Sequence, residues 1–163
     1  MSTGWPERLV VRPWAPGDAD RVAAWRYDGP WGVYDIGAAD ELPRAAGEYL
    51  ALVGADDDRM VGFYCTGAEA RVPGLRAEFG VIDLGVGMDP RWVGRGHGRS
   101  FGSTVIADIR RAHPVSALRA VVQSWNARSR RLLGNLGFVE SGSHTCVQNQ
   151  RSIDYVVVLQ PPP

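Results

Sequence analysis

Three glycines alternate with other residues in the segment from Met88 to Gly102, which reads MDPRWVGRGHGRSFG. Gly94, Gly96 and Gly98 lie between a stretch with strand character and a stretch with helical periodicity. A helix start presents unpaired N–H groups and the positive end of the helix dipole. Glycine lets an anion approach because it has no Cβ. The segment is therefore a candidate phosphate site; the alternative is a flexible surface turn.

The spacing of these glycines excludes two familiar phosphate motifs. The dinucleotide fingerprint G-x-G-x-x-G needs glycine at its sixth position. Counting from Gly94 leads to Arg99, and counting from Gly96 leads to Phe101, so neither register fits. The P-loop G-x-x-x-x-G-K-[ST] needs a lysine, and the chain has none. If the segment binds phosphate, its motif is neither the dinucleotide fingerprint nor the P-loop.

The composition narrows the class of protein. The 18 basic and 18 acidic residues cancel, which argues against a nucleic-acid partner bound through bulk charge. The opening MSTGWPERLV has no apolar signal core, and no apolar run approaches membrane-spanning length. The two cysteines, Cys65 and Cys146, are too few for a disulfide scaffold, and nothing marks them as metal ligands. We therefore expect a cytoplasmic protein with no membrane partner and no metal.

The residues before the glycines predict the first elements. Alternation predicts a strand over residues 8–13. Asp18 is predicted to cap a helix that places Val22 and Trp25 on one face. Residues 28–46 are aromatic and interrupted by Gly and Pro, which predicts a loop with a short helical turn.

A hairpin is predicted around Asp56–Asp58, between YLALVGA and RMVGFYCTG. A loop and a further strand, FGVIDLGVGMD, follow. Gly85 and Gly87 weaken that strand and indicate either a bulge with close approach of a ligand or relief of crowding in a buried sheet.

A helix follows the glycines, because Phe101, Val105, Ile106 and Ile109 share one face and the segment AHP ends it. Next come a strand, ALRAVVQSW, and a short helix capped by Asn126 and ended by Gly137. Two antiparallel strands close the chain, over residues 138–148 and 153–160, and residues 158–163 are predicted to be a loose tail. This order predicts an α+β fold in a single domain over residues 1–163.

Two motifs resemble those of the GNAT N-acetyltransferase superfamily. VGRGHG, residues 93–98, resembles the pattern [QR]-x-x-G-x-[GA] that follows a strand and precedes a helix, although Val93 replaces Gln or Arg. NARSRRLLGNLGF, residues 126–138, is similar to the later motif N-x-x-[AS]-x-x-x-[YL]-x-x-x-GF. LVVRPWAPGDADRVAAW looks like the first strand and helix of the ribosomal-protein N-terminal acetyltransferase-like branch. The resemblance covers nearly the whole chain.

The resemblance implies a mixed, mostly antiparallel sheet of about seven strands, with helices on both faces and a splayed central strand pair. It also implies acetyl-CoA as co-substrate and an N-acetyltransferase that moves the acetyl group to a primary amine in a ternary complex. Backbone groups near Val86 and Met88 would pair with the pantetheine arm. The residues implied to surround the pyrophosphate are Val93, Gly94, Arg95, Gly96, His97, Gly98 and Arg99. Of these, His97 is expected to contribute its backbone.

For catalysis, the resemblance places Leu133 where many members carry a tyrosine as general acid. Asn126 and Ser129 would face the pantetheine or the acetyl-bearing end, and Ser129 is a candidate to protonate the departing thiolate. The proposed base is Asp83, because it lies within an otherwise apolar run, VIDLGV, that would raise its pKa. The alternative is an Asp that orders a loop or binds substrate ammonium; Glu140 and His144 are further candidates for the base.

The acceptor would be a small-molecule amine or a protein N-terminus. Tyr27 and Tyr34 are predicted to wall its pocket, because loop aromatics with polar tips suit that task. The missing tyrosine motivates a second hypothesis, a non-catalytic acyl-CoA-binding or sensing module. A third is an α+β domain whose glycines form a turn. The sequence leaves a homodimer open.

Overall fold

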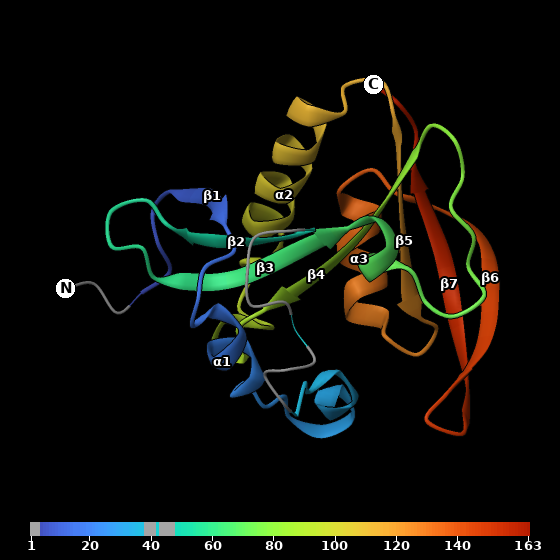
Figure 1. Ribbon diagram of the computed structural model, residues 1–163, viewed down its shortest axis with the longest axis horizontal. Coiled ribbons are helices and arrows are strands. Elements are labelled where there is room, and N and C mark those ends of the chain that lie inside the picture. The colour runs from blue at the N-terminus through green and yellow to red at the C-terminus, as the bar shows by residue number, and fades with distance from the viewer. Residues whose placement is uncertain (1–3, 38–41, 43–47) are drawn as a thin grey trace. The chain divides into compact units, whose positions relative to one another are not determined.

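A computed structural model of the chain describes residues 4–37, 42 and 48–163. In this part of the chain, seven strands form a sheet in the order β1-β2-β3-β4-β5-β7-β6 (Figure 1). The elements are β1 (Leu9–Pro13), α1 (Asp18–Ala23), η1 (Gly29–Tyr34), β2 (Tyr49–Gly54), β3 (Met60–Thr66), η3 (Gly67–Ala70), β4 (Val81–Met88), η4 (Pro90–Trp92), α2 (Gly98–Ala112), β5 (Ala117–Gln123), α3 (Ala127–Asn135), β6 (Val139–Gln148) and β7 (Arg151–Gln160). The predicted fold, a mixed and mostly antiparallel α+β sheet, is confirmed.

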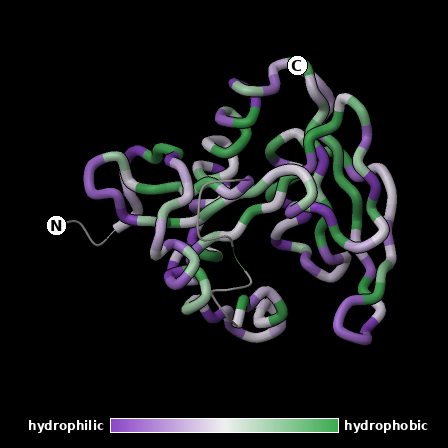
Figure 2. The backbone as a smooth tube through the Cα atoms, in the orientation of Figure 1, coloured by the Kyte–Doolittle hydropathy of each residue, from purple (hydrophilic) through white to green (hydrophobic). Residues whose placement is uncertain are grey.

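The chain divides into two compact units, residues 1–64 with 86–98 and residues 65–85 with 99–163. In the first unit, β1 pairs antiparallel with β2 from Leu9–Gly54 to Pro13–Leu50. Figure 2 shows hydrophobic residues along β2 and β3 and a hydrophilic turn between them, the predicted turn at Asp56–Asp58.

Aromatic side chains form the core of the first unit. The rings of Trp14, Tyr49 and Phe63 lie 5.5 to 5.9 Å apart between centroids. Trp25 stacks on Phe63 at 6.1 Å, and Val22 of α1 is also buried. Both residues of the predicted inward face are buried, but Trp25 lies beyond the end of α1 at Ala23.

Asp18 does not cap α1, as the sequence suggested; it is the first helical residue, and Gly17 takes the cap position. Its buried carboxylate instead accepts hydrogen bonds from Arg12 Nη1 and Nη2, at 2.8 and 3.0 Å, and from the Ala15 N–H at 2.8 Å. The loop between β1 and α1 is closed by this ion pair, which a capping pattern alone does not reveal.

In the second unit, β7 pairs antiparallel with β5 from Leu118–Gln160 to Gln123–Tyr155, and with β6 along its other edge. Asn149 and Gln150 connect β6 to β7 with φ of 50° and 64°, as a tight two-residue hairpin requires. Phe101, Val105 and Ile109 of α2 are buried as predicted, whereas Ile106 is half-buried.

The predicted loose tail over residues 158–163 is wrong at its start, because β7 continues to Gln160. Val158 is buried and pairs with Ala120 of β5. The Gln160 side chain donates to the Leu136 carbonyl at 2.7 Å and accepts from Arg110 at 2.8 Å. Strand pairing and side-chain hydrogen bonds therefore hold the chain up to Gln160.

The parallel pair of the sheet is β4 with β5, and its register runs from Val81–Ala117 to Asp83–Arg119. Beyond Arg119, β5 keeps its pairing with β7 as far as Gln123. β4 itself continues to Met88. The parallel register thus covers the first three residues of each strand.

We expect Asp18→Asn to lower the free energy of unfolding by about 3 kcal/mol at pH 7, because it leaves Arg12 without its buried counter-ion. Burial raises the pKa of Asp18, but the Arg12 and Ala15 hydrogen bonds and the Arg12 charge outweigh it, so the pKa lies below its ordinary 3.8. The stabilisation is therefore present above pH 3.8 and lost as the pH falls through the folded-state pKa.

Urea unfolding at several pH values measures this effect, and the gap between wild type and variant should narrow below about pH 4. Asp20→Asn, on the exposed side of the same helix, is the matched control and should change little. A gap that stays constant down to pH 2 would contradict the ion-pair explanation.

Candidate active site

Two glycines of the loop adopt backbone angles that favour glycine. Gly94 and Gly96 have φ of 74° and 87°, in the left-handed region that side chains disfavour. A Cβ at Gly96 would meet no atom of the described residues within 4 Å, so this part of the chain leaves the space beside it open. Gly98 is the first residue of the 15-residue α2. The loop thus runs directly into a helix start, the arrangement in which backbone N–H groups bind an anion.

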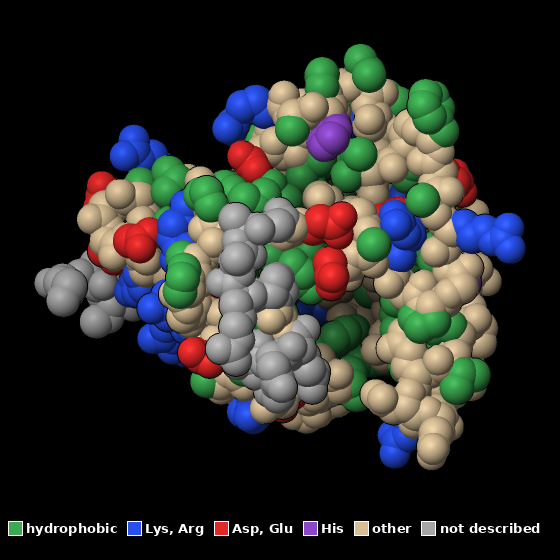
Figure 3. All heavy atoms as spheres, in the orientation of Figure 1, with side chains coloured by type: hydrophobic (Ala, Val, Ile, Leu, Met, Phe, Trp, Pro, Cys, Tyr) green, Lys and Arg blue, Asp and Glu red, His purple; other side chains and the backbone are tan. Residues whose placement is uncertain are grey.

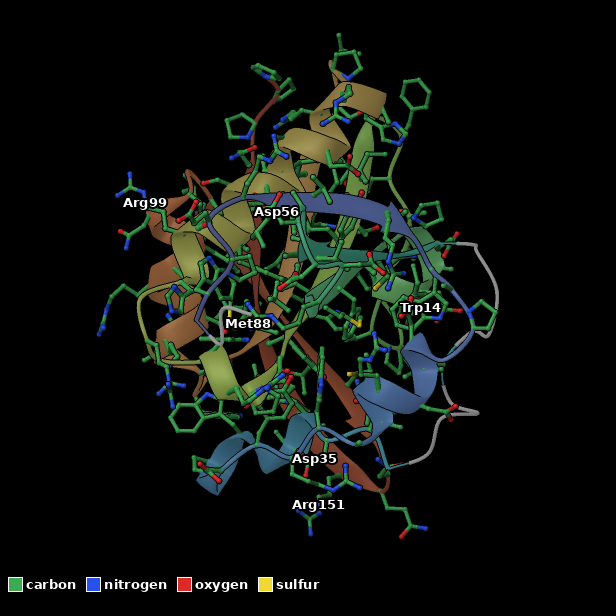
Figure 4. The ribbon with its side chains drawn as sticks, turned by 90° about the vertical axis from the view of Figure 1, so that its left-hand side faces the viewer. Trp14, Asp35, Asp56, Met88, Arg99 and Arg151 are labelled. Carbon is green, nitrogen blue, oxygen red and sulfur yellow. The ribbon has the colours of Figure 1, made fainter. Side chains whose placement is uncertain are left out.

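The basic residues of the loop are accessible. Arg95 and Arg99 are both exposed, and Val93 is half-buried. Figure 4 labels Arg99 at the start of α2, on the outside of the fold. An exposed guanidinium beside an anion site can add charge-assisted hydrogen bonds, so the position of both arginines suits a phosphate ligand.

His97 has side-chain contacts that sequence reasoning missed. Its ring stacks on Trp5 with centroids 4.4 Å apart and an interplanar angle of 5°. Trp92 lies edge-on to His97 at 5.6 Å and edge-on to Trp5 at the same distance. Trp5 lies outside every motif that we identified, so the sequence carried no signal for this contact.

The end of β4 is fixed by Tyr27. Its hydroxyl donates to the Met88 carbonyl at 2.6 Å, and its backbone N–H donates to Asp35 Oδ1 at 2.8 Å. Figure 4 labels Met88 and Asp35, the two residues that Tyr27 joins. Burial, with the charges of Asp89 and Asp35, raises the pKa of Tyr27 well above 10.0. The hydroxyl therefore stays protonated and can donate its hydrogen bond across the neutral range.

Val86 is half-exposed, although β4 has a neighbour on each side in the sheet order. The two glycines that flank it are explained by packing. A Cβ at Gly87 would lie 2.3 Å from the Phe63 ring, and one at Gly85 would lie 3.2 Å from Cys65 Sγ. Neither glycine has a positive φ. Of the two interpretations of these glycines, the structure supports relief of crowding.

Asp83 does not lie in apolar surroundings, and that expectation is wrong. Its buried carboxylate accepts hydrogen bonds from Arg119 at 2.6 and 3.1 Å and from Arg71 at 3.0 Å. The hydrogen bond with Asp83 is the main cause that raises the pKa of the Arg119 guanidinium. Since cationic donors occupy both carboxylate oxygens, Asp83 is placed to hold β4 against β5 rather than to accept a proton from substrate.

The two further candidates for the base also have structural partners. Glu140 pairs with Arg130 at 2.8 Å, and this hydrogen bond lowers the pKa of Glu140. A lowered pKa makes a carboxylate a weaker base at neutral pH. His144 Nε2 lies 2.8 Å from the Pro73 carbonyl, which ties β6 to the loop that precedes β4.

The later motif forms a capped helix, as predicted. The Asn126 side chain accepts from the Ser129 N–H at 3.1 Å and so caps α3. At the other end, Gly137 has φ of 93°, and the Phe138 N–H donates to the Leu133 carbonyl at 3.0 Å. This is the Schellman arrangement that requires glycine. Asn126 is buried, and Ser129 and Leu133 are half-buried.

Tyr34 is half-buried in η1, the predicted short helical turn. Most of the remaining predicted loop lies outside the described residues. A separate cavity of about 570 Å³ in the first unit is lined mainly by charged side chains. Its carboxylates Asp57, Asp58 and Asp89 pair with Arg59, Arg12 and Arg91, so their charge is compensated within the protein.

No group of His, Cys, Asp and Glu in the described part of the chain is arranged to hold a metal ion. Among the described helices, none is long and apolar enough to cross a bilayer.

A family model for the acetyltransferase (GNAT) domain matches residues 8–139, most of the chain. The chain belongs to the GNAT acetyltransferase family. It is an N-acetyltransferase that uses acetyl-CoA, and the hypothesis of a non-catalytic binding module is not favoured.

Solved structures of GNAT acetyltransferases share the fold. A GNAT acetyltransferase from Bacillus anthracis is 14% identical, with 95% of both chains covered and a TM-score of 0.72. The ribosomal-protein-S5-alanine acetyltransferase from Vibrio fischeri is 18% identical, with 99% of this chain and 97% of that chain covered and a TM-score of 0.63.

A third structure, yncA from Salmonella typhimurium with its cofactor acetyl-CoA, is 20% identical, with 95% and 94% covered and a TM-score of 0.61. No curated protein matches the sequence.

We expect Asp83→Asn to act on stability rather than on proton transfer. The change removes the buried counter-ion of Arg119 and leaves only the exposed Glu78 beside it, so the free energy of unfolding should fall by about 3 kcal/mol. The shape of the pH–rate profile of the folded enzyme should stay that of wild type. Chemical denaturation measures the stability. Initial rates across roughly pH 6 to 10, a range that includes the titration of α-amino groups, measure the pH dependence.

Glu140→Gln removes a carboxylate from an exposed ion pair and serves as the control, with little expected change in either measurement. A wild-type stability for Asp83→Asn together with a shifted pH–rate profile would instead identify Asp83 as the base.

Proposed function

We propose that the glycine loop, residues 93–98, and the start of α2 bind the pyrophosphate of acetyl-CoA. The observation that carries this proposal is the left-handed conformation of Gly94 and Gly96 directly before Gly98, the first residue of α2. Backbone N–H groups of Gly94 to Arg99 would donate to the phosphate oxygens. The exposed Arg95 and Arg99 would add charge-assisted contacts.

The pantetheine arm would lie along the end of β4, where backbone groups of Val86 and Met88 would pair with its amides. The half-exposed Val86 supports this position. The Met88 carbonyl already accepts from Tyr27, but a carbonyl oxygen has two lone pairs and can accept a second hydrogen bond. For Asn126 and Ser129, at the start of α3, contact with the pantetheine or the acetyl-bearing end stays a prediction from the family resemblance.

We propose direct transfer in a ternary complex. The neutral amine attacks the thioester carbonyl carbon, and backbone N–H groups near Val86 to Met88 stabilise the developing oxyanion. The C–S bond then breaks, and the thiolate takes a proton from Ser129 or from solvent. The attacking nitrogen loses one proton to solvent to give the neutral amide, and Ser129, where it has donated, regains its proton from solvent. The Leu133 side chain has no acidic proton to donate. The carboxylates of Asp83 and Glu140 are paired with arginines. Deprotonation of the ammonium by solvent therefore fits the described residues best.

The acceptor would be a small amine or a protein N-terminus, and Tyr27 and Tyr34 would wall its pocket. Tyr27 supports this position because its hydroxyl reaches the end of β4. Figure 3 shows acidic and basic side chains interspersed on the face in view. A strongly charged polymer would favour a surface of one sign, so we favour acceptors recognised by a single amine.

Both cysteines are free thiols, which suits the reducing cytoplasm that we propose as the site of action. If the enzyme is a homodimer, β6 offers the longer edge strand of the sheet for pairing between copies.

Wild-type enzyme should release CoA thiol from acetyl-CoA with at least one member of a panel of small amines and N-terminal peptides. Gly96→Val should raise the KM for acetyl-CoA by tenfold or more, because a β-branched residue disfavours a φ of 87° and its side chain would enter the anion space. Thiol-release rates and calorimetric titration with CoA measure both effects.

Gly80→Val is the matched control, because Gly80 also has a positive φ, 77°, and open space around its Cβ position but lies before β4. It should cost stability without changing the KM for acetyl-CoA. Unchanged affinity in Gly96→Val would refute the pyrophosphate site, and absence of thiol release with every acceptor would refute the transferase.

Tyr27→Phe should lower kcat/KM for acetyl-CoA by about three- to tenfold, because it removes one hydrogen bond to the β4 backbone and keeps the ring. Since the pKa of Tyr27 is raised above 10.0, its hydroxyl stays protonated below that pH. The ratio of wild-type to variant rates should therefore be constant from neutral pH to about pH 10. A ratio that changes between pH 7 and 9 would instead show that Tyr27 exchanges a proton during catalysis.

A further inference from the structure

The aromatic cluster of Trp5, Trp92 and His97 connects the N-terminal segment with the glycine loop. Trp5 and His97 are parallel, with centroids 4.4 Å apart, and Trp92 is edge-on to both. Stacked and edge-on pairs at such distances add to the energy of simple burial. His97 stands between Gly96 and Gly98, so its ring is the side chain by which the centre of the loop is held.

The glycine loop needs such a contact, because glycine backbones lose the most conformational freedom on ordering. Gly94 and Gly96 both adopt left-handed angles, and a Cβ at Gly96 would meet no atom of the described residues within 4 Å. Packing on the Cβ side of Gly96 therefore does not restrict the backbone there. A ligand that requires the ordered loop binds more tightly when the protein has already restricted it.

The N-terminal segment is itself anchored to the β2–β3 hairpin. The Arg59 side chain donates to the Gly4 carbonyl, and its guanidinium lies 5.7 Å from the centre of the Trp92 ring. Pro6 packs against Gly54 at the end of β2. These contacts of its neighbours fix the position of Trp5, so that its ring can stack on His97.

We propose that Trp5 is a positioning residue for the pyrophosphate loop, acting through its stack on His97. The inference rests on the proposed function of the loop. Trp5 touches no substrate in this proposal; it restricts the backbone whose N–H groups bind the pyrophosphate. The effect should therefore appear in the binding of donors that carry a pyrophosphate and be missing for donors that lack it.

The test compares acetyl-CoA with S-acetyl-pantetheine, which keeps the thioester and the pantetheine amides but has no pyrophosphate. Trp5→Ala should raise the KM for acetyl-CoA about three- to tenfold. The kcat, and the kcat/KM for S-acetyl-pantetheine, should stay at the wild-type values. A loss of folded enzyme would lower the rate with both donors equally, so the two-donor comparison separates positioning from stability.

Companion variants assign the effect to the stack. His97→Ala should match Trp5→Ala, and the double variant should be no worse than either single one. His97→Phe keeps a flat ring and should restore most of the affinity. Trp5→Leu keeps apolar bulk without a ring and replaces Trp5→Ala if the latter does not fold. Glu7→Ala, an exposed residue of the same segment, is the control and should resemble wild type.

Equal effects of Trp5→Ala and Trp5→Leu on both donors, or an unchanged KM for acetyl-CoA, would overturn the proposal. Gly96→Val measured beside them separates this failure from that of the proposed function. If Gly96→Val selectively weakens acetyl-CoA and the Trp5 variants do not, the loop binds pyrophosphate without help from Trp5. If neither does, the pyrophosphate site itself is wrong.

Discussion

The buried ion pair between Asp83 and Arg119 fixes the point at which the parallel strands β4 and β5 meet. The two residues are register partners at the last parallel pair, and both are almost fully buried. A buried charge without a partner is costly, so the carboxylate and guanidinium must stay opposite each other. Arg119 also donates to Glu78 and to the Arg76 carbonyl, which ties the loop before β4 to the same place. The stretch of β4 from Leu84 to Met88 begins from this anchor.

The end of β4 and the glycine loop are then held by side chains from elsewhere in the first unit. Tyr27 fixes the Met88 carbonyl, Asp89 accepts from the Arg91 N–H, and Trp5 stacks on His97. A loop that binds an anion through its backbone needs its N–H groups aimed in advance, because each group ordered on binding lowers affinity. The polar and aromatic contacts around residues 88–98 would provide that restriction for the proposed site.

The sequence predicted the elements well where the local signal is strong. The turn at Asp56–Asp58, most of the buried face of α2, and both ends of α3 are as expected, because glycine, proline and apolar periodicity act over a few residues. It failed where a distant partner decides the role of a residue. Asp83 was interpreted from its apolar neighbours in the chain, but Arg119 lies 36 positions away. Val158 is a second case, since its pairing with β5 determines its surroundings. Asp18 differs, because its partner Arg12 is only six positions away and the capping pattern does not indicate an ion pair.

The sequence by itself determined the family resemblance, the order of elements and the glycine loop, because these depend on residue type and spacing along the chain. Tertiary structure decided which polar groups are available for chemistry. In the folded chain, the Asp83 carboxylate pairs with Arg119 and the Tyr27 hydroxyl donates to the Met88 carbonyl. The Phe63 ring fills the space that a side chain at Gly87 would need. Tertiary structure also brought Trp5 to His97 across 92 positions of chain, which no local pattern encodes. Hydrogen bonds and ring stacking act through a few ångströms of space, whatever the separation in sequence.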